Sequence, residues 1–244
     1  MKNRIPDGHW LISKACAHRG FHGDGAPENS VLAFERAIDR DFPIETDVQL
    51  TSDLIPVCFH DDNLKRITGK DALIWDTTFE EVRTLKILET NQNIITFEEF
   101  LKLVDGRVPL LIEIKSQPKN AVVVQKVIEL LDGYKGDYVI QSFDPRIMKI
   151  VRKLRPSIIR GQLMCKDRHK NLSLLVDKLV SNGFLNFLSK PDFINMNQKY
   201  LPVSRRVRKN KRVLCWTVVN QEQEKNALKF VQGYVFENIN PKLK

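Results

Sequence analysis

A strand-like run with charge inside it decides the fold: Pro43-Ile44-Glu45-Thr46-Asp47-Val48-Gln49-Leu50. Because side chains two residues apart point the same way in an extended strand, Glu45 and Asp47 share one face. Glu113 and Lys115 share a face in the same way in the run Pro109–Lys115. Both runs therefore predict strands that carry inward-facing charged pairs.

Strand-like and helix-like segments alternate on both sides of these two runs. The other strand-like runs are Lys14–Arg19, Val57–His60, Tyr138–Phe143, Ile158–Met164, Phe193–Asn197, Val213–Val218 and Gly233–Phe236. Segments of helical period include Ser30–Asp39 and Thr96–Val104, the second behind a Thr-x-x-Glu capping-box pattern. Strands that alternate with helices favour parallel pairing through crossover helices, and 244 residues is a normal length for one such barrel. We predict a single TIM (β/α)8 barrel domain over residues 1–244.

The strand-like runs number one more than an eight-stranded barrel needs. Pro43–Leu50 and Val57–His60 are separated only by Thr51–Pro56, which is too short for a crossover helix. One of the two is therefore a hairpin arm or an extension outside the barrel pattern, and the sequence leaves open which. The segment after the third strand-like run is longer than one crossover helix requires, and it predicts a small inserted lobe over about residues 61–108.

Composition is that of an ordinary globular protein, with 42% hydrophobic and 28% charged residues. No apolar run approaches the roughly 20 residues that a membrane-spanning helix needs, and Met1–Lys14 lacks the apolar core of a secretory signal. The four cysteines show no C-x-x-C spacing, so we expect buried thiols in a reducing compartment. These features predict a cytoplasmic protein. The oligomeric state stays open.

Two segments bear on contact with anionic partners. The net charge is +9, and the densest basic run is Arg205–Arg212. We interpret that run as a solvated helix end leading into the next strand; the alternative is a patch for anionic lipid headgroups or nucleic acid. No aromatic residue interrupts it, so we expect no nucleic-acid partner and at most weak contact with anionic membranes. Lys166–Lys190 predicts a barrel-packing helix, with a membrane-touching helix as the alternative. Its apolar face would be formed by Leu172, Leu175, Leu179 and Phe187.

Three carboxylates point to a metal site. Burying Glu45, Asp47 and Glu113 inside one barrel is costly unless something neutralises them. A divalent cation would do so, and oxygen ligands without cysteine favour Mg²⁺ or Ca²⁺. Lys115 is either the ion-pair partner of Glu113 or a cation aimed at a phosphoryl oxygen, and both roles can hold together.

Two histidines are candidates for proton transfer beside that metal. His18 and His60 each end a strand-like run, and barrel active sites gather where strands end. Imidazole titrates near neutrality, so the pair can divide general-base and general-acid work. Arg19 offers the planar fork that suits phosphate. Trp216 is either a wall for the organic part of a substrate or a core aromatic.

These residues lie within motifs that resemble the glycerophosphodiester phosphodiesterase family over nearly the whole chain, from Ala17 to Glu237. The motifs, in order, are H-R-G at 18–20, P-E-N-S at 27–30, E-T-D-V-Q-L-T-S-D at 45–53, P-V-C-F-H-D at 56–61, L-K-R-I-T at 64–68, I-E-I-K at 112–115, Q-S-F-D at 141–144 and W-T-V-V-N at 216–220. The resemblance implies a TIM barrel that uses a divalent metal to hydrolyse glycerophosphodiesters to an alcohol and sn-glycerol 3-phosphate. It also implies that the three carboxylates hold the metal, that His18 and His60 are the acid/base pair, and that Arg19 and Lys115 bind the phosphate.

The chain departs from the family pattern at three places. Leu54 stands where the family usually has glycine, a second glycine is absent around Asp41-Phe42, and Asn238 replaces an aspartate. None of these touches the proposed metal or histidine positions, so we expect the chemistry to be retained while substrate preference stays open. Two rival functions are a lysophospholipase D or sphingomyelinase-D-like activity on a lipid phosphodiester, and a non-catalytic basic binding barrel.

Overall fold

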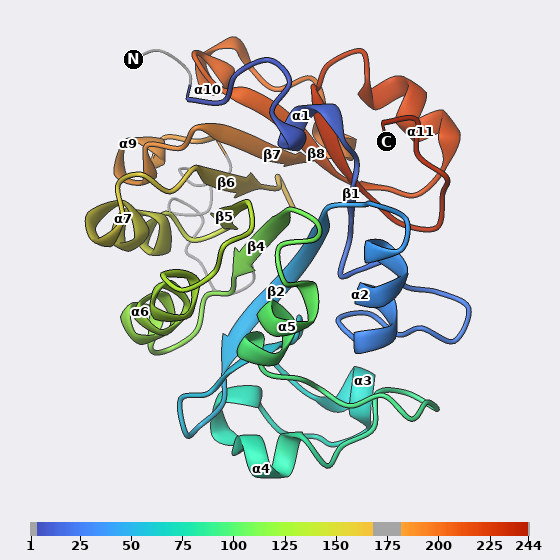
Figure 1. Cartoon of the computed structure of the whole chain (residues 1–244). Coiled ribbons are helices and arrows are strands. Elements are labelled where there is room, and N and C mark those ends of the chain that lie inside the picture. The colour runs from blue at the N-terminus through green and yellow to red at the C-terminus, as the bar shows by residue number, and fades with distance from the viewer. Residues whose placement is uncertain (1–3, 168–181, 244) are drawn as a thin grey trace. The chain divides into compact units, whose positions relative to one another are not determined.

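The computed structural model describes residues 4–167 and 182–243 (Figure 1). These residues form two compact units: residues 17–138 make one, and residues up to 16 together with those from 139 onward make the other. The predicted helical positions Leu172, Leu175 and Leu179 lie outside the described residues.

Strand β2 (Ile44–Leu50) organises the unit of residues 17–138. It pairs in parallel with β4 (Leu110–Ile114), and Ala17 of β1 (Cys16–Ala17) lies opposite Ile44. Strand β3 (Pro56–Cys58) is antiparallel to β2, because the chain reverses in a turn in which the Leu54 N–H donates to the Thr51 carbonyl at 3.0 Å. Thus β3 is the hairpin arm that the sequence left undecided, and it ends two residues before His60.

The two predicted helices of this unit are confirmed, with their caps. Helix α2 (Val31–Ile38) begins after Ser30, whose hydroxyl accepts from the Ala33 N–H at 3.2 Å. Helix α5 (Phe97–Val104) begins with the full capping box of Thr96 and Glu99. The third helix of crossover length is α6 (Asn120–Leu131). Buried apolar faces hold α2 and α5 together, with the Phe34 and Phe100 rings 4.4 Å apart.

The segment between β3 and α5 has a small apolar cluster. It contains α3 (Lys65–Thr68), the 3-10 turn η1 (Ile74–Asp76) and α4 (Phe79–Val82). Short helices of this kind cannot bury much surface singly, so they share one cluster. Its buried members are Val57, Phe59, Leu64, Ile67, Ile74, Val82, Ile87 and Ile94.

The other unit contains a parallel sheet that starts at its boundary with β5 (Tyr138–Ser142). Neighbours then follow chain order through β6 (Arg160–Met164), β7 (Phe193–Asn197), β8 (Arg212–Val218) and β9 (Gly233–Phe236). The helices in the described part of this unit are α1 (Trp10–Ser13), α7 (Pro145–Leu154), α9 (Asn186–Ser189), α10 (Arg205–Arg208) and α11 (Gln221–Ala227), with a 3-10 turn η2 (Gln198–Tyr200). The predicted alternation of strand and helix is therefore confirmed here.

All four cysteines are free and buried, as predicted. Three lie in strands, and Cys165 directly follows β6. Within residues 4–167 and 182–243, no helix is long and apolar enough to cross a membrane.

Candidate active site

Three buried carboxylates meet in the unit of residues 17–138. Glu45 and Asp47 come from β2 and Glu113 from β4, and the pairing register sets Asp47 opposite Glu113. Their side chains are buried, and one oxygen atom from each lies within 4.8 Å of the others. The structure thus brings together the three residues that the strand periodicity placed on inward faces.

Two cations face this carboxylate cluster. Lys115 directly follows β4, and its Nζ lies 3.0 Å from Glu113 Oε1 and 3.6 Å from Asp47 Oδ1. The Arg19 Nε lies 3.3 Å from Asp47 Oδ2, and the backbone N–H of Arg19 donates to Glu45 Oε2 at 3.1 Å. Lys115 is therefore an ion-pair partner of Glu113, and its role toward a phosphoryl oxygen stays a prediction.

The conformation of Arg19 depends on the glycine that follows it. Gly20 has φ +82°, and a Cβ there would lie 2.8 Å from the backbone of Ala33 in α2. Only glycine fits this close approach without displacing the helix. Arg19 itself has φ +54°, and its carbonyl accepts from the Asn29 N–H at 3.0 Å. The H-R-G motif is thus a tight turn that presents Arg19 to the carboxylates.

Burial and neighbouring charge separate the pKa values of the carboxylates. Burial, together with the charges of Asp47 and Glu113, raises the pKa of Glu45 well above its ordinary value. Burial also acts to raise the pKa of Asp47, but the positive charges of His60, Lys115 and other nearby cations outweigh it, so that pKa is lowered. Of the two carboxyl groups on β2, Asp47 therefore holds its negative charge more strongly than Glu45 does.

Asp47 offers a lone pair to a further ligand. Its Oδ2 accepts from Asn29 Nδ2 at 3.1 Å, while Asn29 Oδ1 accepts from the Thr46 hydroxyl at 2.8 Å. The other Asp47 oxygen, Oδ1, is buried and accepts no hydrogen bond from the described residues. A buried acceptor without a donor is costly, and three carboxylates suit a hard divalent cation. The three carboxylates, and an Asp47 Oδ1 whose nearest described cation is Lys115 at 3.6 Å, beyond hydrogen-bond distance, fit such an ion.

Both candidate histidines border the carboxylate cluster. His18 follows β1, and its Nε2 lies 3.9 Å from Glu45 Oε2. His60 lies two residues beyond β3, and its Nδ1 is 2.6 Å from Asp61 Oδ1. Asp61 thereby fixes the orientation of the His60 ring, which leaves Nε2 as the nitrogen that can exchange a proton. The structure therefore places His18 beside Glu45, and His60 near enough to Asp47 to act on the pKa of that carboxyl.

A network of ion pairs holds the side chains that contact His60 and Arg19. The Arg66 guanidinium binds Asp61 through Nε at 2.5 Å and Glu28 through Nη1 at 2.8 Å. Glu28 in turn accepts from Arg19 Nη1 at 2.6 Å. Burial opposes the charge of both acids, but Arg66 and the other partners outweigh it and lower the pKa of Glu28 and of Asp61. No role was predicted for Glu28, Asp61 or Arg66, although all three lie in motifs shared with the family.

Trp216 lies on β8, in the unit that contains β5 to β9. Its indole N–H donates to the Asn195 carbonyl at 3.2 Å, and its ring meets Phe143 edge to face at 5.5 Å. These contacts hold the ring in a fixed orientation while its side chain stays partly exposed. Its predicted role beside substrate stays a prediction.

A buried carboxylate cluster bordered by histidines and cations is typical of metal-assisted hydrolases that act on phosphate esters. The family model described as "Glycerophosphoryl diester phosphodiesterase family" matches residues 18–235. YhdW of Bacillus subtilis (strain 168) is 30% identical over 215 residues, covering 84% of this chain and 86% of the relative. A glycerophosphodiester phosphodiesterase of the same organism is 26% identical and covers 87% of this chain and 78% of the relative.

Solved structures agree with this match. A phosphodiesterase from Oleispira antarctica, solved in complex with the product sn-glycerol-3-phosphate, has a TM-score of 0.75 and 25% identity, covering 93% of both chains. The enzyme from Thermotoga maritima has a TM-score of 0.69 and 23% identity, covering 91% of this chain and 93% of that one. The chain belongs to the glycerophosphoryl diester phosphodiesterase family, and its fold is the predicted TIM barrel.

Proposed function

We propose that this enzyme hydrolyses glycerophosphodiesters to sn-glycerol 3-phosphate and an alcohol, with one divalent cation and two histidines. The observation that carries the proposal is the buried Oδ1 of Asp47, which lacks a donor among the described residues in a cluster of three carboxylates. Family membership and the relative solved with sn-glycerol-3-phosphate support the substrate class.

Glu45, Asp47 and Glu113 would hold the cation, as Mg²⁺ or Ca²⁺. When bound, the ion supplies positive charge that stabilises the phosphoryl oxygens as negative charge develops on them. The raised pKa of Glu45 supports this assignment: burial and repulsion from the other carboxylates raise it, and a neighbouring cation offsets both effects.

Arg19 and Lys115 would bind the phosphate from the protein side. Both are held in place: Arg19 by Glu28 and the Gly20 turn, and Lys115 by Glu113 at 3.0 Å. Burial acts to lower the pKa of Lys115, but Glu113 and Asp47 outweigh it and raise that pKa, so the ammonium stays charged. A cation fixed before substrate binds loses little energy to reorganisation during the reaction.

His18 and His60 would move the two protons of the reaction. One imidazole takes the proton from the attacking oxygen, and the other gives a proton to the leaving alcohol. The hydrogen bond from His60 to Asp61 supports a proton-transfer role, because a fixed tautomer presents the second ring nitrogen to substrate.

We further propose that Trp216 lines the organic part of the substrate and that residues 1–244 act as one domain. The enzyme would be cytoplasmic, a location that its free, buried cysteines support.

A substrate panel with and without chelator tests this proposal. We expect release of sn-glycerol 3-phosphate from glycerophosphocholine or glycerophosphoethanolamine, loss of that release in EDTA, and recovery on addition of Mg²⁺ or Ca²⁺. A strong preference for lysophosphatidylcholine would replace the proposal with a lysophospholipase D activity. Full turnover of every substrate in EDTA would contradict the metal assignment.

A further inference from the structure

A cavity of about 610 Å³ opens in the unit that contains β5 to β9. Its lining includes Arg160, the first residue of β6, and Asp192, which directly precedes β7. Lys211 lines it from the position directly before β8. The cavity therefore lies at the amino ends of these strands, whereas the residues of the candidate active site lie within or after strands.

The lining of this cavity is strongly cationic. Its basic side chains are Arg4, Arg152, Arg160, Lys190, Lys209 and Lys211. The one carboxylate among the described lining residues is Asp192, and it is already engaged. Arg4 donates to both of its oxygens, at 2.8 and 2.5 Å, and the Arg160 N–H donates at 2.9 Å. The other cations therefore face the cavity without a carboxylate of their own in its lining.

Two guanidinium nitrogens in this lining are buried and have no hydrogen-bond acceptor among the described residues: Arg160 Nε and Arg152 Nη1. The Arg160 side chain is 5% exposed, and its Nη1 donates to the Pro156 and Ile158 carbonyls at 3.0 and 2.9 Å. Burial lowers the pKa of Arg160; the charge of Asp192 opposes this effect, while the charges of Arg4 and Arg152 add to it. Charged donors buried in this way are costly unless a ligand accepts from them.

We propose that this cavity is a binding site for the phosphate group of an organic phosphate, separate from the site of hydrolysis. Arginine forks and lysine ammonium groups are the donors that bind phosphate oxygens most strongly. The volume lies within the roughly 300–1,000 Å³ of small-molecule sites, which leaves room for an organic part beside the phosphate. Phe187, 66% exposed, with Pro156 and Pro191 gives that part an apolar wall.

The basic run of the sequence contributes to this site. Its first half forms helix α10 (Arg205–Arg208), as the solvated helix end that was predicted. Its second half turns at Asn210, which has φ +58°, and brings Lys209 and Lys211 to the cavity. The run therefore combines a solvent-exposed helix with one edge of a cationic cavity.

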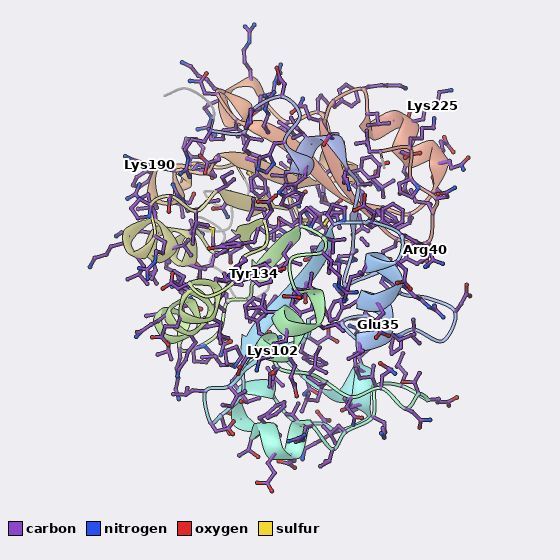
Figure 2. The ribbon with its side chains drawn as sticks, viewed as in Figure 1. Glu35, Arg40, Lys102, Tyr134, Lys190 and Lys225 are labelled. Carbon is purple, nitrogen blue, oxygen red and sulfur yellow. The ribbon has the colours of Figure 1, made fainter. Side chains whose placement is uncertain are left out.

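A triple variant tests the proposal against a matched control. K190Q/K209Q/K211Q removes three lysines from the cavity, and K225Q/K229Q/K242Q removes three exposed lysines elsewhere in the same unit. Figure 2 shows Lys190 and Lys225 far apart on the molecule. In metal-free protein titrated with inorganic pyrophosphate at fixed ionic strength, we expect the cavity variant to bind roughly tenfold more weakly than wild type. The control should bind as wild type does, and both variants should keep the kcat of phosphodiester hydrolysis.

A second arm identifies the source of the phosphate. Sedimentation with vesicles of phosphatidic acid in phosphatidylcholine, with and without competing pyrophosphate, compares a lipid headgroup with a soluble phosphate. Vesicle binding that only the cavity variant loses, and that pyrophosphate displaces, assigns the phosphate to a lipid. Pyrophosphate binding without vesicle binding assigns it to a soluble ester. Equal binding of both probes to the two triple variants, or binding of neither probe to wild type, would overturn the proposal.

Discussion

In the unit of residues 17–138, three buried carboxylates meet two cations, Lys115 and Arg19, and a further acid, Glu28, holds Arg19. In the other unit, six cationic side chains line a cavity whose one described carboxylate is already engaged. The first arrangement leaves one carboxylate oxygen without a donor, and the second leaves guanidinium nitrogens without an acceptor. The charge of the groups that lack a hydrogen-bond partner indicates the ligand: a cation for the carboxylate cluster and an anion for the cationic cavity.

The largest expected effect concerns the histidines of the carboxylate cluster. His18→Ala and His60→Ala should each lower the release of sn-glycerol 3-phosphate by at least about 10²-fold, because each removes a proton-transfer group. Steady-state rates measured beside the exposed control Glu129→Gln on α6 check this expectation. Wild-type turnover in either histidine variant would exclude that residue from the mechanism. The carboxylate cluster would then lack that proton-transfer group.

A smaller effect is expected from Arg66→Met, which removes the cation that holds Asp61 and Glu28. Because Asp61 orients His60, we expect kcat to fall roughly tenfold while the phosphate-binding groups remain. An unchanged kcat would show that the network does not position His60.

Arg66→Met also has a signature in the pH dependence of stability. The folded-state pKa values of Glu28 and Asp61 are lowered, so their stabilisation is complete above their unfolded pKa near 4 and is lost as pH falls toward the folded values. The difference in unfolding free energy between wild type and Arg66→Met should therefore shrink below about pH 4. Urea unfolding at pH 7 and pH 3 measures it, with the exposed Lys126→Met on α6 as control. An equal difference in unfolding free energy at pH 7 and pH 3 would contradict the claim that Arg66 stabilises the ionised forms of Glu28 and Asp61.

The smallest effect concerns backbone strain rather than charge. Leu54, which departs from the family's glycine, has φ +65° in the turn between β2 and β3. A left-handed leucine is strained by about 1–2 kcal/mol, partly offset because glycine has more freedom in the unfolded chain. Leu54→Gly should thus raise the unfolding free energy by less than about 1 kcal/mol. Asp41→Gly, at φ +55°, should gain less because aspartate tolerates this conformation better. A loss of stability in Leu54→Gly would show that packing outweighs strain there.

Local periodicity predicted much of the fold and the carboxylate cluster. Alternation along β2 placed Glu45 and Asp47 on one face, and the capping-box pattern at Thr96 marked the start of α5. These features depend only on residues close in sequence, so they can be recognised within one strand or one helix cap.

Long-range contacts explain what the sequence could not predict. The bridge from Arg66 to Glu28 spans 38 positions, so no local pattern signals it. The cationic cavity joins Arg4 to residues beyond position 150, and only the folded unit brings them together. The family glycine missing at Leu54 became interpretable only once the φ angle of that turn was known.

Asp47, whose Oδ1 accepts no hydrogen bond from the described residues, gives the most direct test of the central claim. Melting temperatures of metal-free wild type, Asp47→Asn and Glu129→Gln, each measured with and without saturating Mg²⁺ or Ca²⁺, report binding independently of activity. We expect the cation to raise the melting temperature of wild type and Glu129→Gln, and to leave that of Asp47→Asn unchanged. An equal rise in all three proteins, or no rise in wild type, would contradict the claim that the buried carboxylates are built to hold a divalent cation.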